Sequence, residues 1–327
     1  MTFHVLIPDN VDQAALDVLS KSDALRVTAP GNMKRDETLA AIGDADAIII
    51  RSGTTADAEL IQAGSKLKVI ARAGVGVDNV DLDAATAHGV VVMNTPGGNT
   101  ISTAEFTFGL MLALARNIPQ GDASLRNGAW DRKAFGGVEL KGKTLGIVGL
   151  GRIGREVAKR AIAFEMTVIG FDPYVEASAL ASLGIEKVSL DDLYGRADFI
   201  TLHSLVTDET RHMINAASIA KMKKGVRIIN AARGALINDA DLAQGIKDGH
   251  VAGAALDVYE FEPPPQDHPL VGLKNVIDTP HLAASTSDAQ INVGVEAAQL
   301  VVDALTSGTY QNVCNPAVLD KVAKPAG

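Results

Sequence analysis

Apolar positions in this chain fall into short runs rich in β-branched residues, with stretches of helical spacing between them. The runs lack polar alternation, which is typical of strands buried on both faces of a parallel sheet covered by helices. The pattern predicts an α/β fold of doubly wound parallel sheets. The predicted strands are HVLIP from His4, AIIIR from Ala47, KVIARAG from Lys68, VVVMNT from Val90, TLGIVGLG from Thr144, TVIGFD from Thr167, FITLHS from Phe199, VRIINAA from Val226, GAALDVY from Gly253 and VIDTPH from Val276.

Two helical segments add to this picture. The cap-rich sequence STSD from Ser285 predicts a helix that ends near Gly308. The segment AEFTFGLMLALAR from Ala104 is apolar all round, so it should be buried on every side, either within one domain or in the seam of a homodimer. The expected apolar face of the first helix consists of Ile291, Val295, Ala298, Val302 and Leu305.

Length and composition narrow the classes of protein. The 327 residues favour about two domains, with joints expected in TPGGNT from Thr95 and near Pro280. Thirty Lys and Arg against 39 Asp and Glu give a net charge of -9, which argues against a nucleic-acid or anionic-membrane partner. The single cysteine, Cys314, excludes an internal disulfide and a CxxC metal site, and no apolar run approaches about 18 residues. We therefore expect a cytoplasmic protein without a bound metal.

A glycine-rich turn is the first candidate for chemistry. Gly149, Gly151 and Gly154 form GxGxxG between an apolar strand and a helix, which is the context of a dinucleotide-binding turn. Asp172 ends the next strand, where a carboxylate can bind the adenosine ribose hydroxyls and disfavour the extra phosphate of NADP. The pattern predicts NAD as the cofactor. Alternatively, the glycines serve only the packing of strand and helix, and Asp172 only caps the turn before Pro173.

Polar residues follow three later strands: Arg233 in NAARG, Glu262 in DVYEFEPP and His281 in TPHLAAST. Ligands of open α/β sheets bind beyond the carboxyl ends of the strands. A guanidinium can bind a carboxylate, an imidazole can exchange a proton near neutral pH, and a nearby carboxylate stabilises imidazolium. The set fits oxidation of a 2-hydroxy acid by hydride transfer from C2. Taken singly, the three could be a surface ion pair, a solvated loop carboxylate and a capping histidine.

Asp257 ends its own strand and is a candidate contact of the nicotinamide carboxamide. The alternative is a buried aspartate that satisfies loop amides.

These motifs resemble those of a known family. GLGRIG with Asp172, HSLVTDETR, NAARGALI, AALDVYEFEPP and PHLAAST are similar to the D-isomer-specific 2-hydroxyacid dehydrogenases. Upstream, IIIRSGTT, RAGVGVDNVD, NTPGGNTISTAE and AWDRKAFGG resemble the branch that oxidises D-3-phosphoglycerate in the first step of serine biosynthesis. The resemblance covers about residues 4 to 316. It implies NAD-dependent formation of 3-phosphohydroxypyruvate, with Arg233, Glu262 and His281 as the catalytic residues and His281 as the general acid and base.

The resemblance also implies an architecture. Two Rossmann-like domains would enclose a cleft, with residues 1–97 and 283–327 as the substrate-binding domain and residues 98–282 as the NAD-binding domain. Hinges are implied near residues 97 and 282, and a homodimer or dimer-based oligomer would be built partly on the helix from Ser102.

The residues carried over by the resemblance form two sets. Cofactor contacts are implied at Gly149, Gly151, Arg152, Ile153, Gly154, Asp172, Thr207, Ala231 and Asp257. Substrate contacts are implied at Arg51, Ser52, Gly53, Arg72, Val75 and Gly76. Arg132 and Lys133, after Trp130, are further candidates that reach in from a partner subunit, or alternatively form a solvated basic turn. Four cations in an acidic protein favour a phosphorylated substrate.

Two departures from the family pattern matter. The HxPxT stretch reads His203, Ser204, Leu205, Val206, Thr207, which alters the expected wall on the adenine side. The chain stops soon after NVCNP, so we expect no C-terminal regulatory domain and no serine feedback through one. Other interpretations stay open: a dehydrogenase of another small acid such as glycerate or hydroxypyruvate, or an NAD-sensing corepressor-like protein without catalysis.

Overall fold

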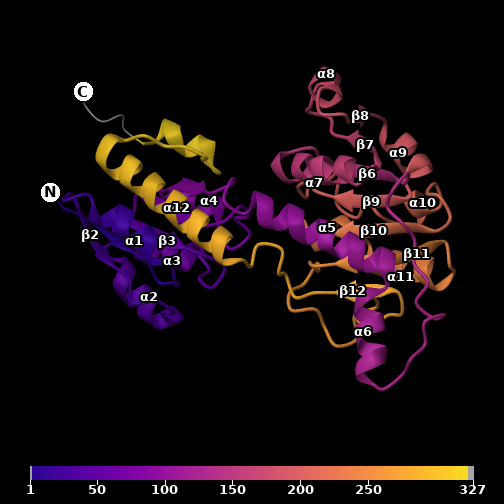
Figure 1. Ribbon diagram of the computed structural model, residues 1–327. Helices are drawn as coiled ribbons and strands as arrows, with labels where there is room; N and C mark the ends of the chain where they lie inside the picture. Colours follow the sequence, from indigo (N-terminus) through magenta and orange to yellow (C-terminus); the bar gives the residue numbers. More distant parts are fainter. Residues whose placement is uncertain (1, 323–327) are drawn as a thin grey trace. The chain divides into compact units, whose positions relative to one another are not determined.

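The computed structural model describes residues 2–322 and divides into two compact units (Figure 1). One unit comprises Met1–Asn99 and Thr286–Gly327, and the other comprises Thr100–Ser285. The chain thus leaves the first unit inside the TPGGNT segment and returns to it a few residues beyond Pro280. That the first unit binds substrate stays a prediction.

The first unit is built on a five-stranded parallel sheet in the order β2-β1-β3-β4-β5, as far as the described residues show. Strand order reverses between β1 and β3, as in other doubly wound sheets. Its elements are β1 (Phe3–Leu6), α1 (Gln13–Ser20), β2 (Leu25–Thr28), α2 (Arg35–Ile42), β3 (Ala47–Ile50), α3 (Ala58–Ala63), β4 (Val69–Arg72), α4 (Leu82–Ala87), β5 (Val91–Asn94), α12 (Ser287–Ser307) and the short 3-10 helix η2 (Pro316–Asp320).

Both faces of this sheet are covered, which explains the uninterrupted apolar strand AIII of β3. Val5, Val69 and Val91 share a cluster with apolar residues of α1 and α12 on one face. The alternate strand residues pack against α3 and α4 on the other face. In Figure 1, α12 lies along α1, although nearly the whole chain separates them in sequence.

The predicted helix after Ser285 is confirmed as α12, but its predicted apolar face is only partly right. Thr286 caps the first turn by accepting from the Ala289 N–H, and Gly308 ends the helix at φ 66°. Of the predicted face, Ala298 and Leu305 are buried, whereas Ile291 is exposed and Val295 and Val302 are half-buried. Contact with both α1 and the sheet shifts the buried stripe to Val293, Ala297, Leu300, Val301 and Ala304.

The second unit holds a seven-stranded parallel sheet within the described chain, ordered β12-β11-β10-β9-β6-β7-β8. Its elements are α5 (Thr100–Arg116), α6 (Ile118–Arg126), β6 (Thr144–Val148), α7 (Arg152–Ala163), β7 (Thr167–Phe171), α8 (Ala177–Ala181), β8 (Glu186–Lys187), α9 (Leu190–Arg196), β9 (Phe199–Leu202), α10 (Ala216–Ile219), β10 (Val226–Asn230), the 3-10 helix η1 (Gly234–Leu236), α11 (Asp239–Lys247), β11 (Val251–Leu256) and β12 (Val276–Asp278).

The apolar helix α5 is not buried on every side within one chain, so that expectation is wrong for the monomer. Phe108, Leu110, Met111 and Leu114 are buried against α7 and strands of the sheet. By contrast, Ile101 is 49% exposed, and Phe106 and Leu112 are half-buried. The alternative, a homodimer seam along the apolar outer side of α5, stays a prediction.

All ten predicted strands are present, and two edge strands were missed. β2 reads LRVT and is only half-buried, whereas β8 contains two exposed residues, Glu186 and Lys187. Neither has the apolar run that predicts a buried strand, because their side chains are not fully covered by helices. In residues 2–322, no helix combines the length and apolar character needed to cross a bilayer.

Candidate active site at the carboxyl edge of the second sheet

The three predicted catalytic residues follow three adjacent strands of the second unit. Asn230 of β10 pairs with Leu256 of β11, and Leu256 pairs with Asp278 of β12, so these strands end level with one another. Arg233, Glu262 and His281 therefore follow the same sheet edge, although up to 48 residues separate them in sequence. The edge is the one at which open α/β sheets bind ligands.

His281 and Glu262 contact each other directly. His281 Nδ1 lies 2.7 Å from Glu262 Oε2, and the Tyr259 N–H donates to Glu262 Oε1 at 3.1 Å. The His281 side chain remains half exposed. Because Nδ1 faces the carboxylate, Nε2 is the ring atom left to exchange a proton with a ligand. His281 has the left-handed φ of 53°, so its backbone is held in an uncommon conformation.

Asp257 holds the turn that carries His281. Its Oδ1 accepts from the Thr279 hydroxyl at 2.6 Å and the Leu282 N–H at 2.8 Å, and its Oδ2 accepts from the Ala283 N–H at 2.8 Å. The His281 N–H donates to the Asp257 carbonyl at 2.8 Å. The alternative of a buried carboxylate that satisfies loop amides is therefore present, and a contact with the nicotinamide carboxamide stays a prediction.

Tyr259 links Glu262 to the turn that carries His281. Its backbone N–H binds Glu262, while its hydroxyl donates to the Thr279 carbonyl at 3.3 Å. Burial, followed by the nearby carboxylates, raises the pKa of Tyr259 to about 12, so this hydroxyl stays protonated as a donor. Tyr259, Glu262, Thr279 and His281 line a pocket of about 430 Å³.

Arg233 lies in a loop that packs against the Glu262 loop. A Cβ atom at Gly234 would lie 1.9 Å from the Tyr259 carbonyl carbon, so only glycine permits this approach. Asn230 holds the loop by donating to the Arg233 carbonyl at 2.9 Å, and Arg233 Nη1 donates to the Ala232 carbonyl at 2.7 Å. The Arg233 loop and the Glu262 loop thus pack closely together at Gly234 and Tyr259.

The glycine-rich turn lies on the same sheet edge, between β6 and α7. Gly149 has a φ of 92°, and a Cβ at Gly154 would lie 2.1 Å from the Gly149 carbonyl oxygen. A Cβ at Gly151 would meet nothing within 4 Å, and no side chain caps the first turn of α7. The turn therefore leaves open space and helix N–H groups for a pyrophosphate, which fits a dinucleotide. Arg152 is exposed and Ile153 half-buried in this first turn.

Asp172 directly follows β7, next to this turn, and is nearly buried. Its Oδ2 accepts from the Leu150 N–H at 2.8 Å, and its Oδ1 accepts from the Tyr174 N–H at 2.9 Å. The turn-capping alternative is therefore present. Each oxygen keeps a further lone pair, so ribose binding remains compatible with the geometry and stays a prediction.

The remaining predicted cofactor residues lie in loops of the same edge. Ala231 is buried directly after β10. The Thr207 hydroxyl donates to Glu209 Oε2 at 2.7 Å and is exposed, and Leu205, at the usual proline position, is 75% exposed. NAD contacts at Ala231 and Thr207 stay predictions.

His203 is a half-buried residue beside the glycine-rich turn, and sequence reasoning assigned it no role. A Cβ at Gly149 would lie 2.7 Å from the His203 carbonyl oxygen, and His203 Nε2 lies 3.0 Å from the Thr201 hydroxyl. Within the described residues its Nδ1 has no hydrogen-bond partner. Burial lowers the pKa of His203 to about 4, so the ring is neutral at pH 7.

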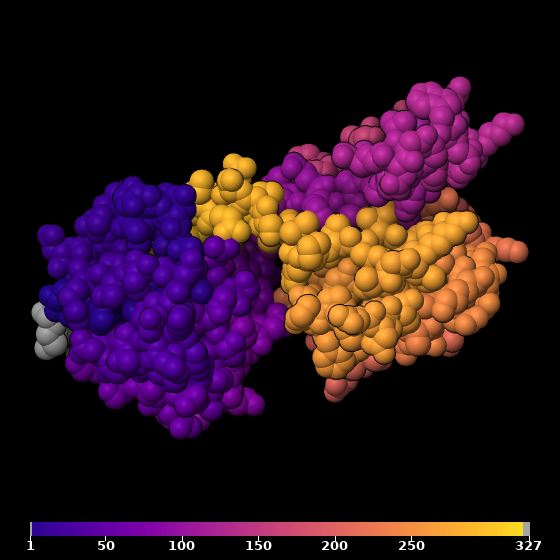
Figure 2. Space-filling model, turned by 90° about the horizontal axis from the view of Figure 1, so that it is seen from below, coloured from indigo at the N-terminus to yellow at the C-terminus, as the bar shows by residue number. Residues whose placement is uncertain are grey.

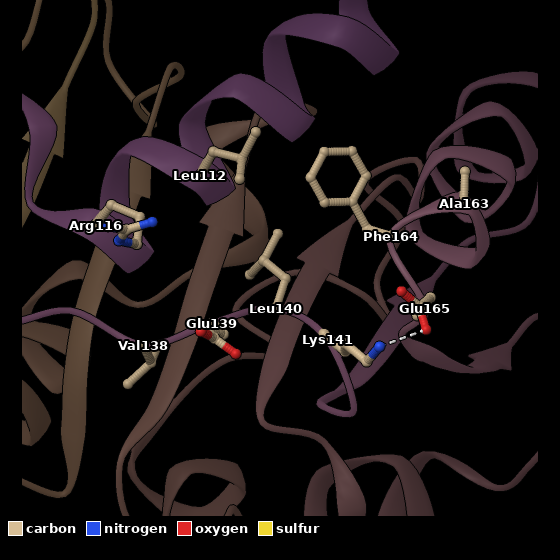
Figure 3. Close-up of a pocket in the computed structure, with 9 residues that line it drawn as sticks. All are labelled: Leu112, Arg116, Val138, Glu139, Leu140, Lys141, Ala163, Phe164 and Glu165. Atoms are coloured by element: carbon tan, nitrogen blue, oxygen red, sulfur yellow. Dashed lines mark ion pairs between the residues drawn. The ribbon is translucent and has the colours of Figure 1, made fainter.

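A pocket of about 370 Å³ lies elsewhere in the second unit (Figure 3). Leu112, Leu140 and Phe164 form its apolar part, and an ion pair of 2.8 Å between Lys141 and Glu165 lies at its margin. None of the predicted catalytic, cofactor or substrate residues lines it. The pocket is therefore separate from the candidate active site.

In the first unit, two predicted substrate cations lie at the carboxyl edge of the sheet. Arg72 is the last residue of β4 and lies beside Ile50, the last residue of β3. Arg51 directly follows Ile50, so both arginines lie at the ends of adjacent strands. Arg51 Nη1 donates to the Asn10 carbonyl at 3.0 Å, and Arg72 Nη1 donates to the Ala73 carbonyl at 3.2 Å. Both side chains remain partly accessible.

The other predicted substrate residues lie in surface turns. Ser52 and Gly53 are exposed in the loop after β3. Val75 and Gly76 are half-buried after β4, where Asn94 Nδ2 donates to the Val75 carbonyl at 2.6 Å. Arg132 and Lys133 are exposed in a turn of the second unit. Their contact with a substrate stays a prediction.

Sequence reasoning missed two residues that organise the first edge, Asp9 and Asn79. Both hydrogen-bond the loop between Arg51 and Thr54. Asp9 follows the first predicted strand, HVLIP, so the rule that singled out polar residues after later strands also applies to it. Asn79 lies between short elements and carries no comparable signal.

The fold and the site together define an NAD-binding dehydrogenase class, and comparisons with known proteins agree. Residues 108–283 match the family described as "D-isomer specific 2-hydroxyacid dehydrogenase, NAD binding domain". The chain belongs to the D-isomer-specific 2-hydroxyacid dehydrogenase family.

Individual relatives are similar over almost the whole chain. A D-3-phosphoglycerate dehydrogenase of Archaeoglobus fulgidus is 49% identical over 95% of this chain and 59% of its own length. The solved TT0316 protein of Thermus thermophilus is 36% identical, with a TM-score of 0.85 over 95% of this chain and all of that one. A glyoxylate reductase of "Paecilomyes thermophila" is 32% identical, with a TM-score of 0.85 over 96% of this chain and 99% of its own. The chain spans about 60% of the length of the curated relatives it matches.

Proposed function

We propose that this protein oxidises D-3-phosphoglycerate to 3-phosphohydroxypyruvate with NAD, the first step of serine biosynthesis. The contact of 2.7 Å between His281 and Glu262, on the sheet edge that also carries the glycine-rich turn, is the observation that carries the proposal. The 49% identity to a phosphoglycerate dehydrogenase supports this substrate among the acids that the family oxidises.

His281 supplies the acid–base chemistry in this proposal. Its Nε2 removes the proton of the C2 hydroxyl, and the electron pair of that O–H bond forms the carbonyl as hydride leaves C2. NAD, when bound, accepts the hydride. The Glu262 carboxylate, 2.7 Å from Nδ1, stabilises the imidazolium that results and fixes the orientation of the ring. Arg233 binds the substrate carboxylate and the developing carbonyl oxygen.

Positively charged side chains in the first unit support a phosphorylated substrate. Arg51 and Arg72 end adjacent strands in a chain of net charge -9, so they supply the local positive charge that a phosphorylated acid needs. Arg132 and Lys133, exposed in the second unit, supply further charge from a partner subunit.

A homodimer accounts for apolar surface that one chain leaves exposed. Leu125 of α6 is 58% exposed, and Trp130, which follows this helix, is 79% exposed. Figure 2 shows the magenta region around α6 standing out from the body of its own unit. Apolar surface of this kind favours association with a second copy. Equilibrium sedimentation gives the mass, and a monomer at micromolar concentration contradicts the dimer.

A second candidate activity is reduction of a smaller 2-oxo acid such as hydroxypyruvate or glyoxylate. The likeness to a glyoxylate reductase, with a TM-score of 0.85, favours it. Both activities use the same acid–base pair, so only the substrate distinguishes them.

A coupled absorbance assay at 340 nm, the NADH band, tests the proposal. We expect turnover of D-3-phosphoglycerate with NAD, little with NADP, and a KM that rises with salt because the phosphate pairs with cations. Preference for glycerate or glyoxylate would support the second candidate. NADH binding without turnover of any 2-hydroxy or 2-oxo acid would support a non-catalytic, corepressor-like protein and contradict both activities.

A further inference from the structure

The loop from Arg51 to Thr54 is held by two side chains from elsewhere in the first unit. Asp9 Oδ2 accepts from the Arg51 N–H at 2.5 Å, and Asp9 Oδ1 accepts from the Thr54 hydroxyl at 3.0 Å. Asn79 Nδ2 donates to the carbonyls of Arg51 and Thr54 at 2.7 and 2.6 Å. One carboxylate and one amide thus fix both ends of the loop.

This loop lies where ligands are expected in such a fold. Leu6 of β1 pairs with Ile48 of β3, so Asp9 and the loop follow neighbouring strands at the same edge. Strand order reverses between these two strands, because β2 lies on one side of β1 and β3 to β5 lie on the other. Open α/β sheets bind ligands at the carboxyl edge of such a switch point.

The middle of the loop offers hydrogen-bond donors. Ser52 and Gly53 are exposed, and their backbone N–H groups donate to no acceptor in residues 2–322. A Cβ at Gly53 would lie 2.7 Å from Asp9 Oδ1, so glycine lets the carboxylate approach the loop closely. Adjacent backbone N–H groups are good donors to the oxygens of a carboxylate or phosphate.

We propose that Asp9 is a positioning residue, which holds the Ser52 and Gly53 N–H groups in the orientation that binds the anionic group of the 2-hydroxy acid. The proposal rests on the proposed function and adds a residue that does not touch the substrate. Both Asp9 oxygens already accept bonds from the loop, so they are occupied in its structure. Their negative charge opposes an anion, so the favourable contribution of Asp9 is its geometry.

Two substitutions of Asp9 separate geometry from charge. In Asp9→Asn, the amide oxygen can still accept from the Arg51 N–H, while the NH2 group donates to the Thr54 hydroxyl. In Asp9→Ala both bonds are lost and the loop is free to move. We expect the KM for D-3-phosphoglycerate to rise about tenfold in Asp9→Ala and to stay within about threefold of wild type in Asp9→Asn. The KM for NAD and kcat should change less than about twofold in both.

Thr54→Val and Asp46→Ala complete the set. Thr54→Val removes one donor to Asp9 while keeping the shape of a buried side chain, so a KM rise of about threefold is expected even if Asp9→Ala does not fold. Asp46 is the matched control at the opposite edge of the sheet. It accepts from the His4 N–H at 2.9 Å and pairs with Lys68 at 2.9 Å. Asp46→Ala should lower the melting temperature without changing the KM for the acid.

The outcomes separate this proposal from the proposed function. An unchanged KM in Asp9→Ala, or equal KM increases in Asp9→Ala and Asp46→Ala, overturns the positioning role while wild-type turnover stands. A fall of kcat in Asp9→Ala with KM unchanged also overturns it. If wild type oxidises no 2-hydroxy acid, the proposed function fails and this proposal fails with it.

Discussion

The carboxyl edges of the two sheets are built from the same topology with different chemistry. Each sheet reverses its strand order, and each edge carries loops that follow adjacent strands. At the edge of the second unit, His281 and Glu262 contact each other and remain partly exposed. At the edge of the first unit, both oxygens of the Asp9 carboxylate accept hydrogen bonds from the loop after β3, and Arg51 and Arg72 are partly accessible cations.

The difference shows how one architecture can separate chemistry from binding. A titratable pair with a free ring nitrogen can move a proton, whereas guanidinium groups and backbone N–H groups can only bind an anion at neutral pH. We therefore expect substitutions in the second unit to change kcat and substitutions in the first unit to change KM. The first three predictions below test this division, and the fourth tests the stability of the second unit.

The largest effect is expected for His281→Ala. Loss of the only proton acceptor of the proposed reaction should lower kcat about a thousandfold. The Kd for NADH, from fluorescence titration, should stay within about twofold, because the glycine-rich turn is untouched. Loss of NADH binding with normal residual turnover would contradict the division of roles.

Glu262→Gln should have the next largest effect. The amide keeps the size of the side chain but removes the charge that stabilises a protonated His281, so kcat should fall roughly tenfold to a hundredfold. The pH profile of kcat/KM should also move, because the charge facing Nδ1 changes. A fall in kcat with an unmoved pH profile would mean that Glu262 serves only to hold the loop.

Arg72→Ala tests the binding edge. D-3-phosphoglycerate loses an ion pair in this variant and glycerate does not, so the ratio of their kcat/KM values should fall about tenfold, mainly through KM. Equal losses for the two acids would remove the argument for a phosphate pocket in the first unit.

The smallest effect concerns stability at acidic pH. Burial lowers the pKa of His203 to about 4 from 6.5, so folding keeps this ring neutral and the native state loses stability as pH falls between these values. Relative to His203→Gln, the free energy of unfolding of wild type should fall by about 1.4 kcal/mol per pH unit below pH 6.5, until the pH reaches the folded pKa. Urea denaturation at pH 7, 6 and 5 measures this slope, and parallel curves for the two proteins would show that His203 titrates normally when folded.

Local residue pattern was sufficient for the elements and the fold class. Runs such as AIII in β3 are apolar at every position because both faces of the sheet are covered by helices. Such runs are easily recognised in the sequence. GxGxxG likewise predicted its own turn, because the steric need for glycine acts within a few residues, as the distance of 2.1 Å at Gly154 shows. The edge strands β2 and β8 escaped detection because β2 is only half-buried and β8 is exposed, so neither carries an apolar run.

Contacts between distant segments required the folded chain. Sequence could name His281 and Glu262 as strand-end residues, but their contact depends on the left-handed turn that Asp257 holds from a neighbouring strand. In the same way, the buried face of α12 is set by its packing against α1 and the sheet. The periodicity of the helix sequence alone could not predict that face. Periodicity and turn chemistry are properties of neighbours in the chain, whereas the partner of a side chain is set by which strands lie side by side.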